Sequence, residues 1–395
     1  MTALTLLEII LVAGGLLVSV LAMVAAVYFL LKLERPHSQK DCRATLILPL
    51  TGGAPNLDGL VDAIARQTLP ARRLLIAVEN ENDPAYARAK AMVATRPLEI
   101  EVVVAGEAKG CAQKCQNQIA ALARLDAGDD AVVLLDADIV PQDWWLSALV
   151  SPLADDFCDV VTGYRWTIVA KPTFGAHLVA AIDRTMAVLP RIAAPLVWGG
   201  TLALSRNALA SLDLRHALAG TLSDDFTIGE RAGTLGLRIL TRRALLVPTP
   251  LAIGLAATWQ FGRRQYQLVR LYRPSLFVLS LASITTRLLA WVVILATMTV
   301  SSWSSIAALA FVGLALGVFL AQQLIAYRLD FPDDLDVALI QVLLAIAKPV
   351  VDLFHWSMIV AALGAKVRWA HVTYDMRTKR AVVIADRTPW PSSSP

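Results

Sequence analysis

The chain has 395 residues, of which 56% are hydrophobic and only 17% are charged, and its mean hydropathy is +0.58. Ordinary globular domains carry about a quarter charged residues and fewer apolar ones, so this composition excludes both a disordered chain and a purely water-soluble enzyme. The net charge of +4, from 36 Lys and Arg against 32 Asp and Glu, is mild and implies no nucleic-acid partner. Part of the chain must therefore lie in lipid.

The first apolar segment covers residues 9–31 and contains no charged residue. Its 23 residues are enough to cross a hydrocarbon core of about 30 Å as a helix, and they are too many for the apolar region of a signal peptide. The basic residues that follow it are Lys32, Arg35, Lys40 and Arg43. By the positive-inside rule they place the next part of the chain in the cytoplasm. We predict an N-terminal membrane helix within residues 1–35.

Residues 36–260 are predicted to form a cytoplasmic α/β domain. Short apolar runs at residues 44–50, 74–80, 99–105 and 131–138 alternate with helical stretches at 56–67, 84–95, 112–125 and 142–153. Repeated strand and helix units are typical of a mostly parallel sheet with helices on both faces. Such sheets bind ligands beyond the carboxyl ends of their strands. We therefore expect the site among the polar residues that follow these four runs.

Residues 261–335 are predicted to form an arginine-rich linker and a transmembrane hairpin. Arg263 and Arg264 precede two apolar stretches, residues 276–300 and 306–327, which a short serine-rich turn separates. Each stretch is long enough to cross a membrane, and the basic flanks return the chain to the cytoplasm.

Residues 336–395 combine an interrupted membrane segment with a basic C-terminal tail. Lys348, Pro349 and Asp352 interrupt the apolar stretch 337–363. This pattern indicates either two half-segments that dip into the membrane and return, or an interfacial helix pair. We place the tail in the cytoplasm, and the chain as a multi-pass protein of the inner, cytoplasmic membrane.

Two pairs of aspartates are the strongest candidates for chemistry. Asp136 and Asp138 close the fourth predicted strand, where two carboxylates can serve one Mg²⁺ or Mn²⁺ ion and the diphosphate that the ion bridges. The alternative is a surface turn in which an Asp caps the next helix. Asp224 and Asp225 precede an amphipathic stretch, so that one can cap a helix while the other is a general base for an attacking hydroxyl.

Two further sets of residues are candidates for binding. Gln260, Arg263 and Arg264 either flank the predicted hairpin as positive-inside charges or supply a guanidinium that neutralises a departing diphosphate. A turn is predicted to line an acceptor pocket. It consists of Trp198, Gly199 and Gly200.

In their order along the chain these motifs resemble the ceramide glucosyltransferase family, which comprises membrane-bound inverting glycosyltransferases of the family 2 and family 21 type with a GT-A fold. Residues 78–85 resemble the family's first aspartate segment, which contacts the nucleotide. The resemblance therefore implies donor binding by Glu79, Asn80 and Asp83, although Asn80 stands where the family has an aspartate.

The later motifs extend the resemblance over most of the chain. Residues 110–117 are similar to a Gly-x-Asn-x-Lys-x-x-Asn element, which implies donor binding by Lys114 and Asn117. Asp136 and Asp138 match the metal-binding motif, in which Asp136 also contacts the donor. In the family's acidic pair the second member, here Asp225, is the base. Residues 367–374 resemble a C-terminal Trp-Arg-Gly-x-x-Tyr element, whereas no Trp follows Gln260, Arg263 and Arg264 as it does in the family's Gln/Arg-x-x-Arg-Trp element.

The resemblance implies an inverting transfer of a sugar from a nucleotide-diphosphate donor, expected to be a UDP-sugar, to the hydroxyl of a membrane lipid. That acceptor would be ceramide-like, a hopanoid or another glycolipid precursor, with Asp224 on the acceptor side. The alternatives are a processive polysaccharide synthase, a membrane scaffold that has lost catalysis, and a haloacid-dehalogenase-like phosphatase, whose D-x-D-x-(T/V) pattern residues 136–140 also fit.

Overall fold

The computed structural model describes residues 5–34, 42–190, 196–375, 377–379 and 382–390. By its internal contacts the chain divides into two bodies. The helical body comprises Met1–Leu33, Trp166–Pro190 and Pro250–Gly364, and the α/β body comprises Glu34–Arg165, Arg191–Thr249 and Ala365–Pro395. Two of the predicted flanking charges, Arg35 and Lys40, lie outside the described residues.

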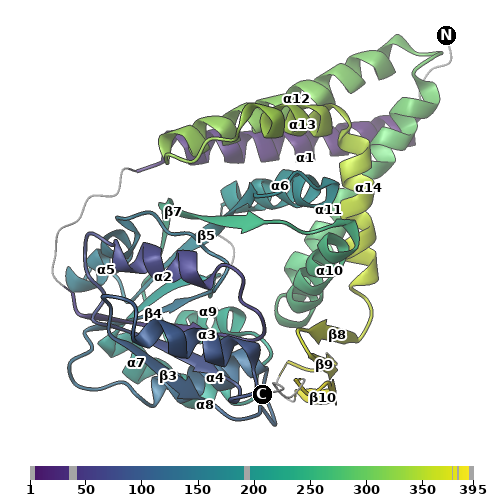
Figure 1. The fold of residues 1–395 in the computed structure, drawn as a ribbon. Helices are drawn as coiled ribbons and strands as arrows, with labels where there is room; N and C mark the ends of the chain where they lie inside the picture. The colour runs from purple at the N-terminus through teal and green to yellow at the C-terminus, as the bar shows by residue number, and fades with distance from the viewer. Residues whose placement is uncertain (1–4, 35–41, 191–195, 376, 380–381, 391–395) are drawn as a thin grey trace. The chain divides into compact units, whose positions relative to one another are not determined.

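The sheet has seven strands in the order β3-β2-β1-β4-β6-β5-β7. Figure 1 shows this sheet among the helices of the α/β body. Its strands are β1 Ala44–Pro49, β2 Arg73–Val78, β3 Ile100–Val104, β4 Ala131–Leu135, β5 Val160–Val169, β6 Thr201–Ser205 and β7 Ile239–Leu251. The first four strands run parallel, whereas β6 runs antiparallel to both of its neighbours. The predicted mostly parallel sheet is therefore confirmed.

Helices follow the parallel strands as the sequence pattern predicts. In the α/β body they are α2 Leu57–Ala65, α3 Pro84–Val93, α4 Gln113–Leu122, α5 Trp145–Ala154, α7 Arg206–Leu212, α8 Leu214–Leu218 and α9 Asp224–Thr234. The central strands β2 and β4 are buried along their whole length, as expected for a sheet that helices cover on both faces. Leu46, Leu48, Ile76 and Val133 belong to the resulting apolar core.

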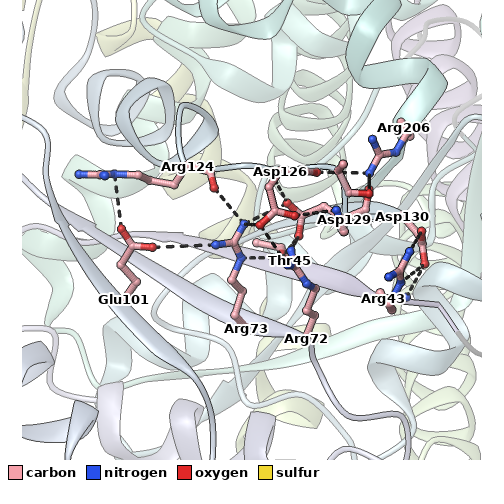
Figure 2. Close-up of polar contacts among 12 residues, drawn as sticks. Arg43, Thr45, Arg72, Arg73, Glu101, Arg124, Asp126, Asp129, Asp130 and Arg206 are labelled. Atoms are coloured by element: carbon pink, nitrogen blue, oxygen red, sulfur yellow. Dashed lines mark hydrogen bonds and ion pairs between the residues drawn. The ribbon is translucent and has the colours of Figure 1, made fainter.

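A charged cluster joins the amino-terminal ends of the strands (Figure 2). Asp129, which is 3% exposed, accepts hydrogen bonds from Thr45 of β1 and from Arg72, and Arg73 of β2 donates to it at 3.0 Å. Burial alone would raise the pKa of Asp129, but these hydrogen bonds outweigh it and hold the pKa low. The cluster lies at the edge of the sheet where parallel strands begin, so we assign it a structural role.

The C-terminal residues belong to the α/β body. They form a three-stranded antiparallel sheet from β8 Lys366–Trp369, β9 Val372–Asp375 and β10 Val383–Arg387. In this sheet the hydroxyl of Tyr374 accepts a hydrogen bond from the backbone N–H of Gln113 at 3.0 Å. The C-terminal sheet therefore adds a layer to the body that carries the parallel strands.

The helical body contains α1 Leu6–Leu31, α6 Phe174–Val188, α10 Leu255–Tyr272, α11 Pro274–Thr297, α12 Ser302–Arg328, α13 Leu335–Ile346 and α14 Lys348–Ala361. Among the described residues, α1, α11 and α12 are long and apolar enough to cross a membrane. The close approach of α1 to its neighbours depends on Gly15, where a Cβ atom would lie 2.7 Å from Ala290 and 2.9 Å from Phe311. Small residues of this kind let membrane helices pack closely.

Helices α13 and α14 are long and apolar enough to cross a membrane only when they are taken together. The chain bends by 83° between them, at Ala347. The chain leaves the α/β body before α10 and returns to it at β8. If α11 and α12 each cross the membrane, a single further crossing would leave β8 on the wrong side. The bent pair therefore fits two half-segments that enter and leave on one side, or an interfacial pair, as the interrupted sequence predicts.

Candidate active site

The antiparallel pairing of β4 with β6 brings distant residues together at the carboxyl edge of the sheet. Asp136 directly follows β4, and Leu135 pairs with Thr201, the first residue of β6. The turn of Trp198, Gly199 and Gly200 therefore lies beside the end of β4. Two motifs that are more than 60 residues apart in the sequence meet here because of strand register.

Lys114 on α4 connects the two aspartate pairs. Its Nζ lies 2.8 Å from Oδ1 of Asp136 and 3.1 Å from Oδ2 of Asp224. One helical turn later, Nε2 of Gln118 donates to the same Asp224 oxygen at 2.7 Å. Burial would lower the pKa of Lys114, but the charges of the surrounding aspartates, including Asp225, raise it well above its ordinary value. Lys114 is therefore a cation that links the predicted metal ligands to the aspartate pair that contains the predicted general base.

Gly199 closes one side of this arrangement. A Cβ atom at this position would lie 2.6 Å from Oδ2 of Asp224 and 3.1 Å from Nζ of Lys114, so any side chain would displace the ion pair. The preceding Trp198 is buried, and its ring centroid lies 5.7 Å from that of Tyr164. The turn is thus fixed against the carboxylates, and its place in an acceptor pocket stays a prediction.

Asp225 is the second residue of α9 and is half-buried. Its Oδ1 accepts hydrogen bonds from the hydroxyl of Ser223 and from the backbone N–H of Phe226, the latter at 2.7 Å. Burial and the neighbouring charge of Asp224 raise the pKa of Asp225 to about 6. A carboxyl group with a pKa near the working pH is well suited to general base catalysis.

Asp138 is the most accessible of the four carboxylates, although protein atoms surround it densely. This crowding, followed by the charge of Asp136, raises the pKa of Asp138 to about 6, and the positive charges of Arg165 and Lys114 oppose the rise. At neutral pH the Asp138 carboxylate is ionised and open to a ligand.

The charges of the site favour a cation. Among the described residues, four carboxylates stand against Lys114 and Arg165, so acidic groups outnumber basic ones there. Within the described residues no group of three or more His, Cys, Asp or Glu side chains is arranged to hold a metal. An ion here would therefore need oxygens from a bound phosphate beside Asp136 and Asp138. Mg²⁺ and Mn²⁺ sites built on one or two carboxylates plus substrate phosphates have this composition.

The segment after β2 is held by the C-terminal sheet. Glu79 is 1% exposed, pairs with the guanidinium of Arg387, and has Oε2 at 2.8 Å from Nε2 of His371. Burial raises the pKa of Glu79, and Arg387 partly offsets this rise. The side chain of Asn80 accepts a hydrogen bond from the backbone of Asn82 at 2.9 Å. Glu79 thus has one charged protein partner, Arg387, while Asn80 is half-buried.

Asp83 is both a helix cap and a possible ligand. Its Oδ1 accepts hydrogen bonds from the backbone N–H groups of Ala85, at 2.9 Å, and Gly52, at 2.8 Å. Its buried Oδ2 has no hydrogen-bond partner among the residues that the structure describes. A buried acceptor in this state is expected to find a donor, and an N–H or O–H group of a bound nucleotide would supply one.

Asn117 joins the carboxyl ends of β1 and β2. Its amide nitrogen donates to the carbonyl groups of Leu50, at 2.8 Å, and Ala77, at 3.1 Å, and its oxygen accepts from Gln113 at 2.9 Å. The side chain is fully buried. These contacts give Asn117 a role in the shape of the site, and donor contact by Asn117 itself stays a prediction.

Two residues of this region, Arg387 and Trp390, escape an interpretation of the sequence alone, whereas His371 lies in the element at residues 367–374. Arg387 and His371 approach Glu79, and the ring of Trp390 lies 3.3 Å from where a Cβ of Gly52 would be, with ring centroids of His371 and Trp390 4.2 Å apart. Residues 367–374 resemble a family element, and this was the only signal that the C-terminus takes part.

The predicted leaving-group residues belong to the helical body. Gln260, Arg263 and Arg264 lie on α10. There, Nε of Arg263 donates to the carbonyl of Ala361 at 3.1 Å, and its guanidinium lies 5.9 Å from the ring centroid of Trp259. The aspartates and Lys114 are brought together within the α/β body, whereas the contribution of these three residues to the same site stays a prediction.

Comparison with known proteins identifies one matching family and several solved structures with a similar fold. The model of glycosyl transferase family 21 matches residues 15–382. No curated protein sequence matches the chain. Among solved structures, the mannosyltransferase PcManGT from Pyrobaculum calidifontis, in complex with GDP-Man and Mn²⁺, matches with a TM-score of 0.50 and 18% identity, over 90% of this chain and 96% of that one. At this identity the similarity shows the fold.

A second similar structure covers a smaller part of the chain. It is glucosyl-3-phosphoglycerate synthase from Mycobacterium tuberculosis in complex with Mn²⁺ and UDP-glucose, with a TM-score of 0.40 and 19% identity. The match covers 60% of this chain and 84% of the synthase.

Proposed function

The chain belongs to glycosyl transferase family 21, and we propose that it moves a sugar from a nucleotide-diphosphate donor to the hydroxyl of a membrane lipid, with inversion at the anomeric carbon. The observation that carries the proposal is the position of Lys114, whose ammonium bridges Asp136 on the predicted donor side and Asp224 on the predicted acceptor side. The phosphatase alternative is set aside, because the family is one of glycosyltransferases.

The donor is proposed to bind at the carboxyl ends of β1, β2 and β4. Asp136 and Asp138 would hold a Mg²⁺ or Mn²⁺ ion, which would supply positive charge to the diphosphate as it leaves. The buried Oδ2 of Asp83, which has no hydrogen-bond partner among the described residues, would accept a hydrogen bond from the nucleotide, and the half-buried Asn80 would bind it as well. We expect a UDP-sugar, and the Mn²⁺ complexes of proteins with a similar fold support the choice of ion.

The acceptor is proposed to be activated by Asp225. Both protein hydrogen bonds described for its carboxylate end on Oδ1, so Oδ2 is the oxygen that would take the proton of the attacking hydroxyl. Lys114 and Gln118 hold Asp224 in place beside it. Arg263 or Arg264, with Gln260, would stabilise the departing diphosphate.

A lipid acceptor is proposed because the catalytic body is part of a chain with three helices that could cross a membrane. An enzyme with a soluble sugar acceptor does not need membrane helices, whereas an enzyme with a lipid acceptor must bind its substrate at the membrane. The basic flanks of these helices favour a catalytic body in the cytoplasm, on the inner face of the cytoplasmic membrane.

The deciding experiment is transfer from radiolabelled nucleotide sugars. Membranes that contain the full chain would be incubated with UDP-glucose, UDP-GlcNAc, UDP-galactose and GDP-mannose, and the products extracted into organic solvent. Label in a discrete lipid band supports the proposal. Label in a water-soluble or insoluble polymer favours the processive synthase, and neither transfer nor donor hydrolysis with any sugar favours a scaffold without catalysis.

Removal of the divalent ion is expected to stop transfer. Chelation should reduce the rate by about 10² to 10³, the usual effect of losing charge stabilisation in a transition state, and added Mn²⁺ or Mg²⁺ should restore it. Asp136→Asn should show a loss of similar size that added metal does not restore. Asp130→Asn removes a carboxylate from the opposite edge of the sheet, where it pairs with exposed Arg43, and should behave like wild type. Equal rates in wild type and Asp136→Asn would contradict the assignment.

The rate of transfer is expected to depend on pH near 6. Asp225 must be ionised to accept a proton, and its pKa is raised from 3.8 to about 6. As the pH falls through about 6 the carboxyl group becomes protonated, so kcat/KM should drop by about tenfold for each further pH unit. Donor binding measured at each pH separates this effect from loss of substrate. A profile that stays flat down to pH values near the ordinary pKa of aspartate would contradict a base with the raised pKa of Asp225.

A further inference from the structure

The helical body contains a cavity of about 60 Å³ that is separate from the carboxylates described above. Its walls come from α1, α6, α11, α12, α13 and α14 and are mostly apolar. The polar lining residues are Ser19, Thr185, Arg287, Gln322, Gln341 and Lys348. Of the described residues that line it, two are cations and none is acidic.

Both cations share one carboxylate. Arg287 donates to Asp352 from Nε at 2.6 Å and from Nη2 at 2.5 Å, and Nζ of Lys348 lies 3.0 Å from Oδ1 of the same residue. The Asp352 side chain is fully buried, and Arg287 is 7% exposed. Two cations against one anion leave a surplus positive charge at the cavity. Charge inside an apolar helical body is costly and marks a functional site by default.

Hydrogen-bond donors remain available at this surplus charge. Arg287 has five N–H bonds, and its two contacts with Asp352 are the ones found within the described part of the chain. Lys348 has three N–H bonds, and there it contacts Asp352. An Arg287–Asp352 pair without Lys348 would already be neutral. Lys348 is therefore the group that a purely structural ion pair does not explain.

The break between α13 and α14 falls at the same place. Helix α14 begins at Lys348, directly after the bend of 83° at Ala347, and Ala345, Lys348 and Val351 all line the cavity. The bend therefore places Lys348 at the start of α14 and on the wall of the cavity.

We propose that this cavity binds the phosphate group of an anionic membrane lipid, with the oxygens on Lys348 and Arg287 and the acyl chains along the apolar wall. One negative charge on the phosphate would neutralise the surplus cation. A lipid rather than a soluble phosphate is favoured because apolar side chains surround the charge and the helices around it are those that could lie in a membrane. The site is distinct from the proposed donor and acceptor groups and does not depend on them.

The test uses the full chain in nanodiscs of phosphatidylcholine alone or of phosphatidylcholine with phosphatidylglycerol. Bound lipid is counted by native mass spectrometry after release. Wild type should retain phosphatidylglycerol in preference to phosphatidylcholine, and Lys348→Met should weaken this retention by about tenfold, as for loss of one charge-assisted contact. Lys32→Met removes one exposed positive charge at the end of α1 and should retain the lipid like wild type. Lys348→Arg should retain it as well.

Three outcomes of the retention measurement would overturn the proposal. These are equal retention of both lipids by wild type, equal retention by Lys348→Met and wild type, and equal losses in Lys348→Met and Lys32→Met. Displacement of phosphatidylglycerol by sn-glycerol 3-phosphate alone would show a site for soluble phosphate, which also contradicts a lipid site. If Lys348→Met does not fold, the lipid preference of wild type and of Lys348→Arg decides the question. Because retention is measured without a sugar donor, its failure leaves the proposed transferase activity untouched.

Discussion

Asp225→Asn is expected to lower kcat by about 10² to 10⁴, the usual contribution of a positioned general base. The amide cannot accept the proton of the attacking hydroxyl, which Oδ2 of Asp225 would take. The variant should fold, because Oδ1 of an asparagine can still accept the hydrogen bonds from Ser223 and Phe226. The measurement is single-turnover transfer from the donor identified with the nucleotide-sugar panel.

The binding of the donor provides the control for this variant. Asp225 does not belong to the proposed metal and diphosphate ligands, so the Kd for the nucleotide sugar should stay within about twofold of wild type, a change of less than 1 kcal/mol. Asp225→Glu keeps a carboxylate and should retain more activity than Asp225→Asn. Transfer by Asp225→Asn at the wild-type rate would show that another group is the base, and weaker donor binding would place Asp225 on the donor side.

Asp352→Asn is expected to destabilise the helical body by about 3 to 5 kcal/mol, the cost of removing one partner from a buried ion pair. The substitution leaves Arg287 and Lys348, which now share Asp352, as two cations without a buried anion. Thermal unfolding in detergent should show a large decrease in Tm, and the chain should become more sensitive to proteolysis.

Two further variants show whether unpaired charge causes the destabilisation expected for Asp352→Asn. Asp334→Asn changes an exposed aspartate of the same body that makes no side-chain cap for α13, so its effect should lie within about 0.5 kcal/mol. Replacing the whole cluster in Arg287→Met, Lys348→Met and Asp352→Leu should restore much of the stability, because no charge is then left unpaired. A stable Asp352→Asn protein would contradict the role assigned to this carboxylate.

Local patterns in the sequence predict much of the fold. The runs that became β1, β2 and β4 are apolar apart from Thr45 and Arg73, which is what a sheet buried on both faces requires, and this places Asp136 at a strand end. The membrane helices can be predicted equally well, because a long run of uncharged apolar residues is typical of a helix that crosses a membrane. The interruption at Lys348 likewise marks the break between α13 and α14.

The composition and the local pattern of the sequence thus determine a membrane-associated α/β protein with acidic groups at the carboxyl edge of its sheet. Only the tertiary structure decides which of these groups meet. Lys114 reaches Asp224 across more than 100 residues, Gly199 arrives through the antiparallel register of β6, and Arg387 returns from the C-terminus to Glu79. The physical reason is that periodicity and charge runs record which face of an element is buried, whereas an ion pair between distant elements depends on strand order and register, which no local stretch encodes.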